Sequence, residues 1–474
     1  MKQDIYAELL LLAGFEEPEL STILPDWIQA SKKLGLSEDD VRHAVVDWIP
    51  AHFDIELKGI RKLFGAFLRE AIDLTRAQQY KADGVKIVYG ILPAITSNYL
   101  AIKASGGDQV FVSFPDIFLA VTLNGFFHKV DRYLETAEAG GMTYGCRHCA
   151  LNKTRIAART LDVIPSPDVI WTWGYICDEG PKTDEFMQIM CAQDWDFIIS
   201  RLPHDTHFGE NDSENDRRVK YLAKQMKDGF ESVQEKIGIT VTPESISEAV
   251  GSFGDYAKKL SELIGMVCKA DPQPLDGSAL ACFGYPLSMP FNTGFHHVKD
   301  ALETTIQEVR DRVEAGKGIV PKGSPKLGCY FVSTPVPWIS RMFRENGVAL
   351  SFSILMTPIQ AQLLPVSYDD PYMATAQTWL RKPIGANLGY EIDVTCERVE
   401  TYKPDGMVMG FYDFDRWLGA HQKIMSQAVE KQTGVPHFYM ESDFWDDRDY
   451  SPEALRTRIE SICQIVKMNK MMQG

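Results

Sequence analysis

The fold of this chain is constrained most by short apolar runs that alternate with helix-length segments, a pattern that occurs twice. Strands buried on both faces of a sheet read as nearly continuous apolar runs, and parallel strands need a helix-length crossover between them. The pattern therefore predicts an α/β fold with two parallel sheets covered by helices. The expected strands lie at 85–91, 109–114, 168–175 and 196–202, and again at 328–334, 348–355, 406–414 and 436–443.

The segments outside these two series have helical periodicity. In 1–82 and 211–324 the apolar residues lie three and four positions apart, as on one face of an α-helix. A chain of 474 residues is also too long for one hydrophobic core, since single cores stop growing near roughly 250–300 residues. We therefore expect an N-terminal helical region at 1–82, a first α/β domain at 83–210, a helical bridge at 211–324 and a second α/β domain at 325–474.

The charge of the chain is unfavourable for nucleic-acid binding. Lys and Arg total 49 and Asp and Glu total 65, for a net charge of −16, and no window concentrates basic residues. No segment reaches the roughly 18 uninterrupted apolar residues that a membrane-spanning helix needs. The N-terminal apolar run is shorter than a signal-peptide core and is surrounded by acidic residues. We expect a soluble, cytoplasmic protein without a nucleic-acid or membrane partner.

The 9 cysteines are an odd number at low density, which argues against a disulfide scaffold and raises the question of which are ligands. Cys146 and Cys149 form a Cys-x-x-Cys pair at the expected start of a helix, where thiolates are favoured and two sulfurs can bind one metal or cluster. Cys177 follows the strand at 168–175, and ligands of parallel sheets gather beyond the carboxyl ends of strands. Cys149 and Cys177 are therefore expected at the same sheet edge. A zinc site is the competing interpretation, although no second Cys-x-x-Cys or histidine pair occurs at finger spacing.

Three histidines are candidates for proton transfer. His148 lies inside the Cys-x-x-Cys pair, His421 lies near Asp415, and His204 follows the strand at 196–202 in a polar loop. Each has an alternative role as a surface or hydrogen-bonded core histidine. The other cysteines are expected to be small buried side chains: Cys191, Cys268, Cys282, Cys329, Cys396 and Cys463.

Four motifs follow one another along the chain: Cys149-Ala-Leu-Asn-Lys153, PSPDVIWTWGYICDEGPKTDEF, DGMVMGFYDFDRWLGAHQ and GVPHFYMESDFWDDRDYSPEALRTRIESI. In this order they resemble the subunits of 2-hydroxyacyl-CoA dehydratases and benzoyl-CoA reductases. The likeness runs from about Val85 to Val466 and implies two flavodoxin-like domains, with a 4Fe-4S type iron–sulfur cluster held by three cysteines at their junction. Cys149 and Cys177 match the first two of these cysteines.

The third cysteine of the family is replaced here, because Asp415 occupies its position, seven residues before Gln422. Three possibilities are open: Cys146, one helical turn from Cys149, supplies the third sulfur, Asp415 binds iron through oxygen, or the subunit has lost its cluster. Sulfur is the usual ligand of such clusters, which favours Cys146 over Asp415.

The resemblance also implies an activity. In this family an ATP-hydrolysing activator protein with its own cluster injects a low-potential electron, which the subunit passes to an acyl-CoA thioester for radical dehydration or ring reduction. We therefore expect an anaerobic enzyme subunit, a lyase or oxidoreductase, that pairs with a homologous subunit as a homodimer or heterodimer. The alternatives are a non-catalytic or electron-relaying partner subunit, and a related cluster protein that reduces small molecules without CoA. The sequence does not identify the acyl group.

Overall fold

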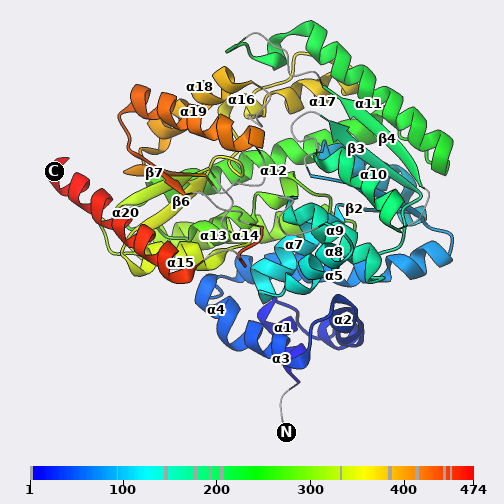
Figure 1. The fold of residues 1–474 in the computed structure, drawn as a ribbon, viewed down its shortest axis with the longest axis horizontal. Coiled ribbons are helices and arrows are strands. Elements are labelled where there is room, and N and C mark those ends of the chain that lie inside the picture. Colours follow the sequence, from blue (N-terminus) through cyan, green and yellow to red (C-terminus); the bar gives the residue numbers. More distant parts are fainter. Residues whose placement is uncertain are drawn as a thin grey trace.

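Two parallel sheets form the centre of the fold. The computed structural model describes residues 4–92, 94–142, 148–174, 179–191, 195–202, 208–330, 334–382, 387–410, 416–440, 445–448 and 451–473. The first sheet contains β1 (Lys86–Gly90), β2 (Val110–Ser113), β3 (Val169–Gly174) and β4 (Asp196–Arg201), and the second contains β5 (Lys326–Cys329), β6 (Ala349–Ser353), β7 (Gly406–Gly410) and β8 (His437–Met440). Figure 1 shows the first sheet in its right half and the second in its left half.

Both sheets have the same strand order, β2-β1-β3-β4 and β6-β5-β7-β8 among the described residues, which is the order of flavodoxin-like folds. All neighbouring strands are parallel; Val88 of β1, for example, pairs with Val112 on one side and Val169 on the other. The order reverses between β1 and β3 and again between β5 and β7. Ligands of such sheets bind beyond the carboxyl ends of the strands at these reversals. The predicted α/β fold with two parallel sheets is confirmed.

Helices cover the first sheet because its strands are apolar on both faces. Trp171 and Trp173 of β3, for example, are fully buried. The helices that pack on these strands are α5 (Lys58–Ala82), α6 (Thr96–Gly106), α10 (Glu179–Cys191) and α11 (Asp216–Ile237). Four further helices pack on one another beside the sheet: α7 (Pro115–Ala120), η3 (Val121–Phe127), α8 (Asp131–Ala139) and α9 (Ala150–Thr160).

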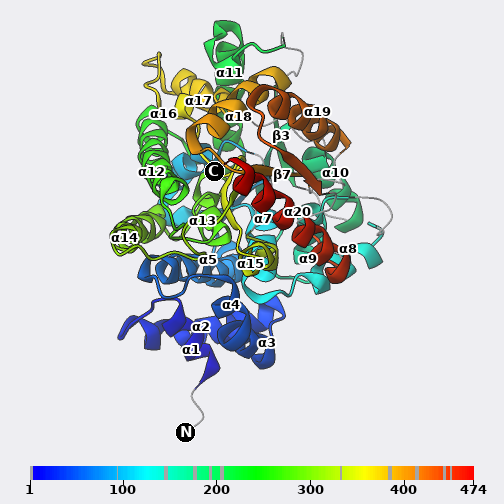
Figure 2. The same ribbon diagram turned by 90° about the vertical axis from the view of Figure 1, so that its left-hand side faces the viewer.

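An N-terminal helical layer precedes the first sheet and lies at the bottom of Figures 1 and 2. Two of its helices start at side-chain caps: Asp4 accepts a hydrogen bond from the Tyr6 amide, and Ser37 and Asp40 form a capping box. The layer packs on α5, whose buried stripe faces the first sheet. It consists of α1 (Ile5–Leu12), α2 (Glu19–Leu34), α3 (Glu38–His43), η1 (Ala44–Trp48) and α4 (Ile49–His52).

A helical bridge connects the two sheets. It comprises α11, α12 (Pro243–Lys269), α13 (Gly277–Cys282), η6 (Tyr285–Leu287) and α14 (Phe295–Glu314). Helix α12 contacts α6 of the first half and β6 of the second, and α14 packs along α5. Asn215 and Thr242 cap α11 and α12, and Gly238 ends α11 with a left-handed φ of 76°. The buried side chains of both halves form one continuous cluster.

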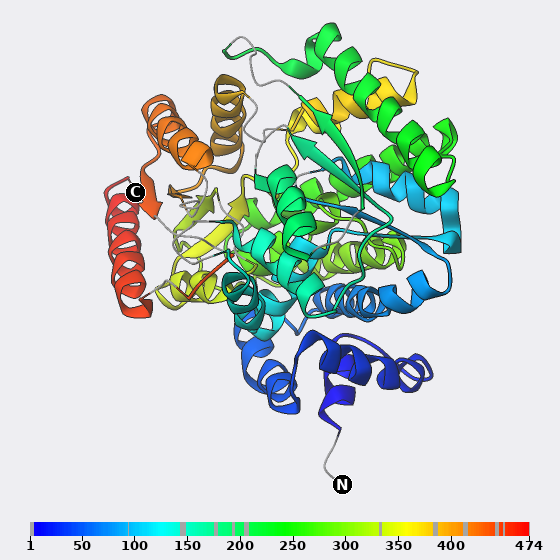
Figure 3. The same cartoon turned by 45° about the vertical axis from the view of Figure 1, so that its right-hand side comes forward.

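The second half contains α15 (Pro337–Glu345), α16 (Gln360–Leu363), α17 (Pro371–Leu380), α18 (Leu388–Tyr402), α19 (Arg416–Thr433) and α20 (Pro452–Gln473). Of these, α15 packs on β6, and α19 packs on β7 and β8. Helix α18 packs on α19, and α17 reaches across to α11 of the first half. Figure 3 shows α20 (red) on the outer side of the second half, where it contacts α15. Within the described ranges, no helix combines the length and the apolar character needed to cross a membrane.

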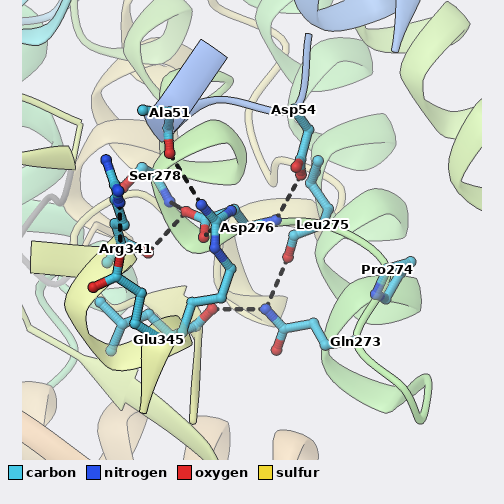
Figure 4. A network of polar contacts seen from close by, with 12 residues as sticks. Ala51, Asp54, Gln273, Pro274, Leu275, Asp276, Ser278, Arg341 and Glu345 are labelled. Atoms are coloured by element: carbon cyan, nitrogen blue, oxygen red, sulfur yellow. Dashed lines mark hydrogen bonds and ion pairs between the residues drawn. The ribbon is translucent and has the colours of Figure 1, made fainter. Parts of the chain in front are cut away.

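A buried polar network joins the N-terminal layer, the bridge and the second half (Figure 4). The carboxylate of Asp276 caps α13, accepts a 2.8 Å hydrogen bond from Ser340 Oγ and lies 3.4 Å from Arg344 Nη1. Arg344 also donates to the Ala51 carbonyl, and the Asp276 amide donates to Asp54 Oδ2 at 3.1 Å. Since these residues come from all three parts of the chain, the network fixes their relative positions.

One predicted strand was misplaced. Strand β5 begins at Lys326 rather than at Gly328, and Cys329 ends the strand instead of lying near its start. The polar Lys326 belongs to the strand because its amide donates to Asp405 Oδ2 at 2.8 Å and its ammonium binds the carbonyls of Cys268 and Ala270. Sequence polarity alone does not reveal such partners.

Candidate functional site

Cys149 is the N-cap residue of α9. Its carbonyl accepts hydrogen bonds from the amides of Asn152 and Lys153 at 3.0 and 3.2 Å, and the residue is buried. A helix N-terminus carries a partial positive charge, which favours the thiolate over the thiol. The position predicted for Cys149 at a helix start is therefore the observed one, and it suits a sulfur ligand.

A buried ion pair joins the middle of α9 to the helix that follows β3. Arg155 Nη1 lies 3.2 Å from Asp184 Oδ1, and Arg155 Nη2 donates to the Gly180 carbonyl at 3.3 Å. Gly180 and Asp184 belong to α10, which follows β3. The Leu92 amide, which follows β1, donates to Asp116 Oδ2 of α7, which follows β2. Helix α9 also packs on α7, and the charge of Arg155 opposes the rise that burial causes in the pKa of Asp116. Helix α9 therefore lies beside the helices that follow β2 and β3.

The charge of Arg155 acts on two buried carboxyl groups, those of Asp184 and Asp116. Burial raises the pKa of Asp184 to about 7, although the charge of Arg155 opposes the rise. Burial likewise raises the pKa of Asp116, again opposed by Arg155. Since two buried carboxylates beside one guanidinium would leave an uncompensated negative charge, Asp184 is the group that changes its protonation near neutral pH.

His148 connects α9 to α10. Its half-buried ring meets the ring of Phe186 edge-on, at a centroid distance of 5.9 Å and an interplanar angle of 78°. Phe186 belongs to α10, the helix that follows the turn in which Cys177 was predicted. Helix α10, which follows Cys177 in the chain, therefore packs against α9, the helix that Cys149 caps.

A chain of ion pairs joins α9 to the segment that follows β8. Lys153 Nζ lies 2.8 Å from Glu138 Oε1, and Arg448 Nη2 lies 2.7 Å from the same oxygen. Asp446 Oδ2 lies 2.6 Å from the same Nη2 atom of Arg448. Burial would raise the pKa of Glu138, but hydrogen bonds from Arg448 and Lys153 lower it overall. The pairs bring the carboxyl end of the second sheet to the helix that carries Cys149.

A second buried pair lies at the carboxyl edge of the second sheet. His421 Nε2 of α19 lies 2.6 Å from Glu391 Oε2 of α18, and both side chains are buried. Tyr330, the residue after β5, donates to Glu391 Oε2 at 3.4 Å. The Gly410 amide at the end of β7 donates to Gln422 Oε1 at 2.8 Å. These contacts hold His421 beside the ends of β5 and β7.

A cavity of about 80 Å³ lies between the carboxyl ends of the two sheets. Leu92 and Ala94 contribute from the segment after β1, and 354–358 contribute from the segment after β6. Lys382 and Arg398 line the same cavity from the region of α17 and α18.

Three of the seven predicted site residues lie in the described part of the chain, namely Cys149, His148 and His421. Cys146, Cys177, His204 and Asp415 fall outside the described residues. Within the described residues, no group of three or more His, Cys, Asp and Glu side chains could hold a metal ion. The ligand set therefore stays a prediction.

Sequence reasoning missed the charged groups that support these edges. Arg155, Asp184, Glu391 and Arg398 all lie within helices and are buried. A charged residue on an otherwise apolar helix face is the only signal that marks them. It does not identify the partner, which comes from another element.

Comparisons with known proteins relate most of the chain to one family. The family model described as 2-hydroxyglutaryl-CoA dehydratase, D-component, matches residues 115–465. A benzoyl-CoA reductase subunit of Thauera aromatica is 26% identical over 268 residues, which are 53% of this chain and 60% of that protein. The (R)-2-hydroxyisocaproyl-CoA dehydratase alpha subunit of Clostridioides difficile is 21% identical over 359 residues, or 71% and 81% of the two chains. The (R)-phenyllactyl-CoA dehydratase alpha subunit of Clostridium sporogenes is 21% identical over 309 residues, or 65% and 72%.

Proposed function

The chain belongs to the 2-hydroxyglutaryl-CoA dehydratase D-component family, and we propose that it is the iron–sulfur subunit of an enzyme that acts on an acyl-CoA thioester. The observation that carries the proposal is the position of Cys149, the buried N-cap of α9, a helix whose Arg155 pairs with Asp184 of the helix that follows β3. Family members typically carry an iron–sulfur cluster, and the relatives are named as subunits of dehydratases and a reductase.

The proposed ligands are Cys149 and Cys177, with Cys146 favoured over Asp415 as the third. A sulfur at a helix N-terminus suits this role, since the helix end favours the thiolate that a cluster requires. Such a cluster, when bound, supplies a low-potential electron to the substrate. The partners in this proposal are an ATP-dependent activator protein with its own cluster and a homologous second subunit.

The residues around the site would hold protons and position the ligands. Glu391 is a carboxylate that can only accept a hydrogen bond when it is ionised, so His421 donates its Nε2 proton to it and its tautomer is fixed. Such a pair can keep a proton at a defined atom beside the end of β7. His148 is the second candidate for this role, next to Cys149. Arg155 and Asp184 keep the start of α9 in place.

A second candidate function is a non-catalytic or electron-relaying partner subunit, which Asp415 at the third ligand position favours. The test is anaerobic isolation of the full chain, alone and with candidate homologous subunits, followed by binding and turnover assays with acyl-CoA thioesters. The proposed function predicts iron in this chain and turnover that needs it. Turnover that continues when this chain carries no iron would assign the chemistry to the partner.

A further inference from the structure

The cavity between the two sheets is lined by two basic side chains and, among the described lining residues, by no acidic side chain. Lys382 follows α17, and Arg398 lies in the middle of α18. Most of the remaining wall is apolar, with Leu92, Leu287 and Trp379 among its members. Two cations in an enclosed apolar cavity are costly unless an anion joins them.

Arg398 has unused hydrogen-bond donors. The side chain is 4% exposed, and its Nη2 donates to the Thr357 carbonyl. Its Nε and Nη1 atoms are buried without a hydrogen-bond partner among the described residues. Burial lowers the pKa of Arg398 to about 10, with Tyr402, Glu397 and Glu391 opposing the shift. The guanidinium stays charged at neutral pH, and two of its nitrogens have no hydrogen-bond acceptor among the described residues.

Lys382 is the second donor. Its ammonium donates to the Leu287 carbonyl at 3.4 Å and lies 4.2 Å from the centre of the Trp379 ring. Burial lowers the pKa of Lys382 to about 7, and no carboxylate opposes the shift. An anion in the cavity would supply a counter-charge to Lys382 and an acceptor to the Arg398 nitrogens that have no partner among the described residues.

The walls restrict the kind of anion. A phosphate carries oxygens on all sides, and several would face apolar groups such as Ile354, Leu355 and Pro358 without hydrogen bonds. A carboxylate on a short hydrocarbon places its oxygens at the guanidinium and its carbon atoms against the apolar wall. The volume of about 80 Å³ admits a group of only a few heavy atoms.

We propose that this cavity is a binding site for a short aliphatic carboxylate, with Arg398 and Lys382 as its ligands. The carboxylate is either the far end of the acyl group of a CoA thioester or a free short-chain acid. The first source rests on the proposed function, whereas the site itself does not, since it requires neither the cluster nor CoA.

The test uses the full-length protein and calorimetric titration with propanoate, propanamide and inorganic phosphate. Propanoate should bind at least tenfold more tightly than propanamide or phosphate. Arg398→Met should weaken propanoate binding by about tenfold to a hundredfold, since hydrogen bonds to charged groups contribute roughly 1.5–3 kcal/mol. Lys382→Met should weaken it by a smaller factor.

Matched controls are Arg61→Met and Lys33→Met, which remove cations that bind backbone carbonyls outside the cavity. Both controls should leave propanoate binding unchanged. If Arg398→Met fails to fold, Arg398→Lys takes its place; because it retains a charge, it should keep part of the propanoate affinity. No propanoate binding by the wild-type protein, equal binding of propanamide or phosphate, or normal binding by a folded Arg398→Met variant would overturn the site.

Succinyl-CoA and butanoyl-CoA separate the two sources. If the carboxylate belongs to the acyl group, succinyl-CoA binds more tightly and Arg398→Met removes the preference. If it is a free acid, the two thioesters bind equally while propanoate still binds. Propanoate binding without binding of either thioester would sustain the site and contradict the proposed function.

Discussion

Replacement of Arg155 by Met tests the buried ion pair that positions the cysteine-bearing helix. The substitution removes the 3.2 Å contact with Asp184 and the hydrogen bond to Gly180, and leaves Asp184 and Asp116 buried without a cation. Breaking a buried pair in this way costs about 3–5 kcal/mol when the remaining group stays charged. The expected loss of unfolding free energy at pH 8 is of this size.

The loss should shrink as the pH falls. In the wild-type protein the pKa of Asp184 is raised to about 7 in the folded state, so folding takes up a proton and stability falls as the pH rises from about 4 to about 7. Without Arg155, both carboxyl groups hold their protons to higher pH, and the decline continues above pH 7 by up to ~1.4 kcal/mol per pH unit for each group. At pH 5, below the raised pKa of Asp184, the loss is smaller and approaches about 1–2 kcal/mol, mainly from the missing hydrogen bond.

Urea unfolding followed by tryptophan fluorescence measures this effect, since Trp171 and Trp173 are fully buried in the neighbouring strand β3. Adding Asp184→Asn to Arg155→Met should restore about 2 kcal/mol at pH 8, because it removes one unpaired charge. Arg42→Met, which breaks an exposed pair with Glu38, is the control and should cost no more than about 0.5 kcal/mol. The same pH slope in wild type and Arg155→Met above pH 7, or no recovery in the double variant, would refute the reasoning.

Three further predictions concern the network, the histidine pair and the third ligand. Asp276→Ala removes a helix cap and the partner of Arg344 in the buried polar network. It should lower the free energy of unfolding by about 2–4 kcal/mol in thermal or urea unfolding. A change below about 0.5 kcal/mol would contradict the role of this network. Glu391→Gln removes the carboxylate that orients His421. It should reduce thioester turnover about tenfold to a hundredfold at unchanged iron content. Normal turnover would exclude His421 as a proton carrier. Cys146→Ala should abolish iron binding while Asp415→Ala spares it, and the reverse result would make Asp415 the third ligand.

The sequence was sufficient for the architecture because strands buried on both faces leave a strong apolar signal. The apolar run at 168–175 corresponds to β3. The segments 1–82 and 211–324, which have helical periodicity, correspond to the N-terminal layer and the bridge. The start of β5 was harder to predict, because Lys326 is polar and its partners Cys268, Ala270 and Asp405 are distant in sequence.

The candidate site was less predictable, since its geometry depends on contacts between elements. The helix start at Cys149 follows from local sequence, and that placement is confirmed. The partner of His421 cannot be predicted from local sequence, because Glu391 lies on a different helix. The same holds for Lys382 and Arg398, which line one cavity only after α17 has packed on α11 and α12 and α18 has packed on α19.

The most direct test of the proposed function is the iron and acid-labile sulfide content of the anaerobically isolated protein, compared between wild type, Cys177→Ala and Cys463→Ala. Cys463 is buried in α20 and serves as the control for loss of a cysteine. We predict about four iron atoms per chain in wild type and Cys463→Ala, with the corresponding electron paramagnetic resonance signal on reduction, and none in Cys177→Ala at unchanged helix content. Equal iron in Cys177→Ala and wild type, or a wild-type chain without iron both alone and with a homologous subunit, would contradict the assignment of the cluster to this chain.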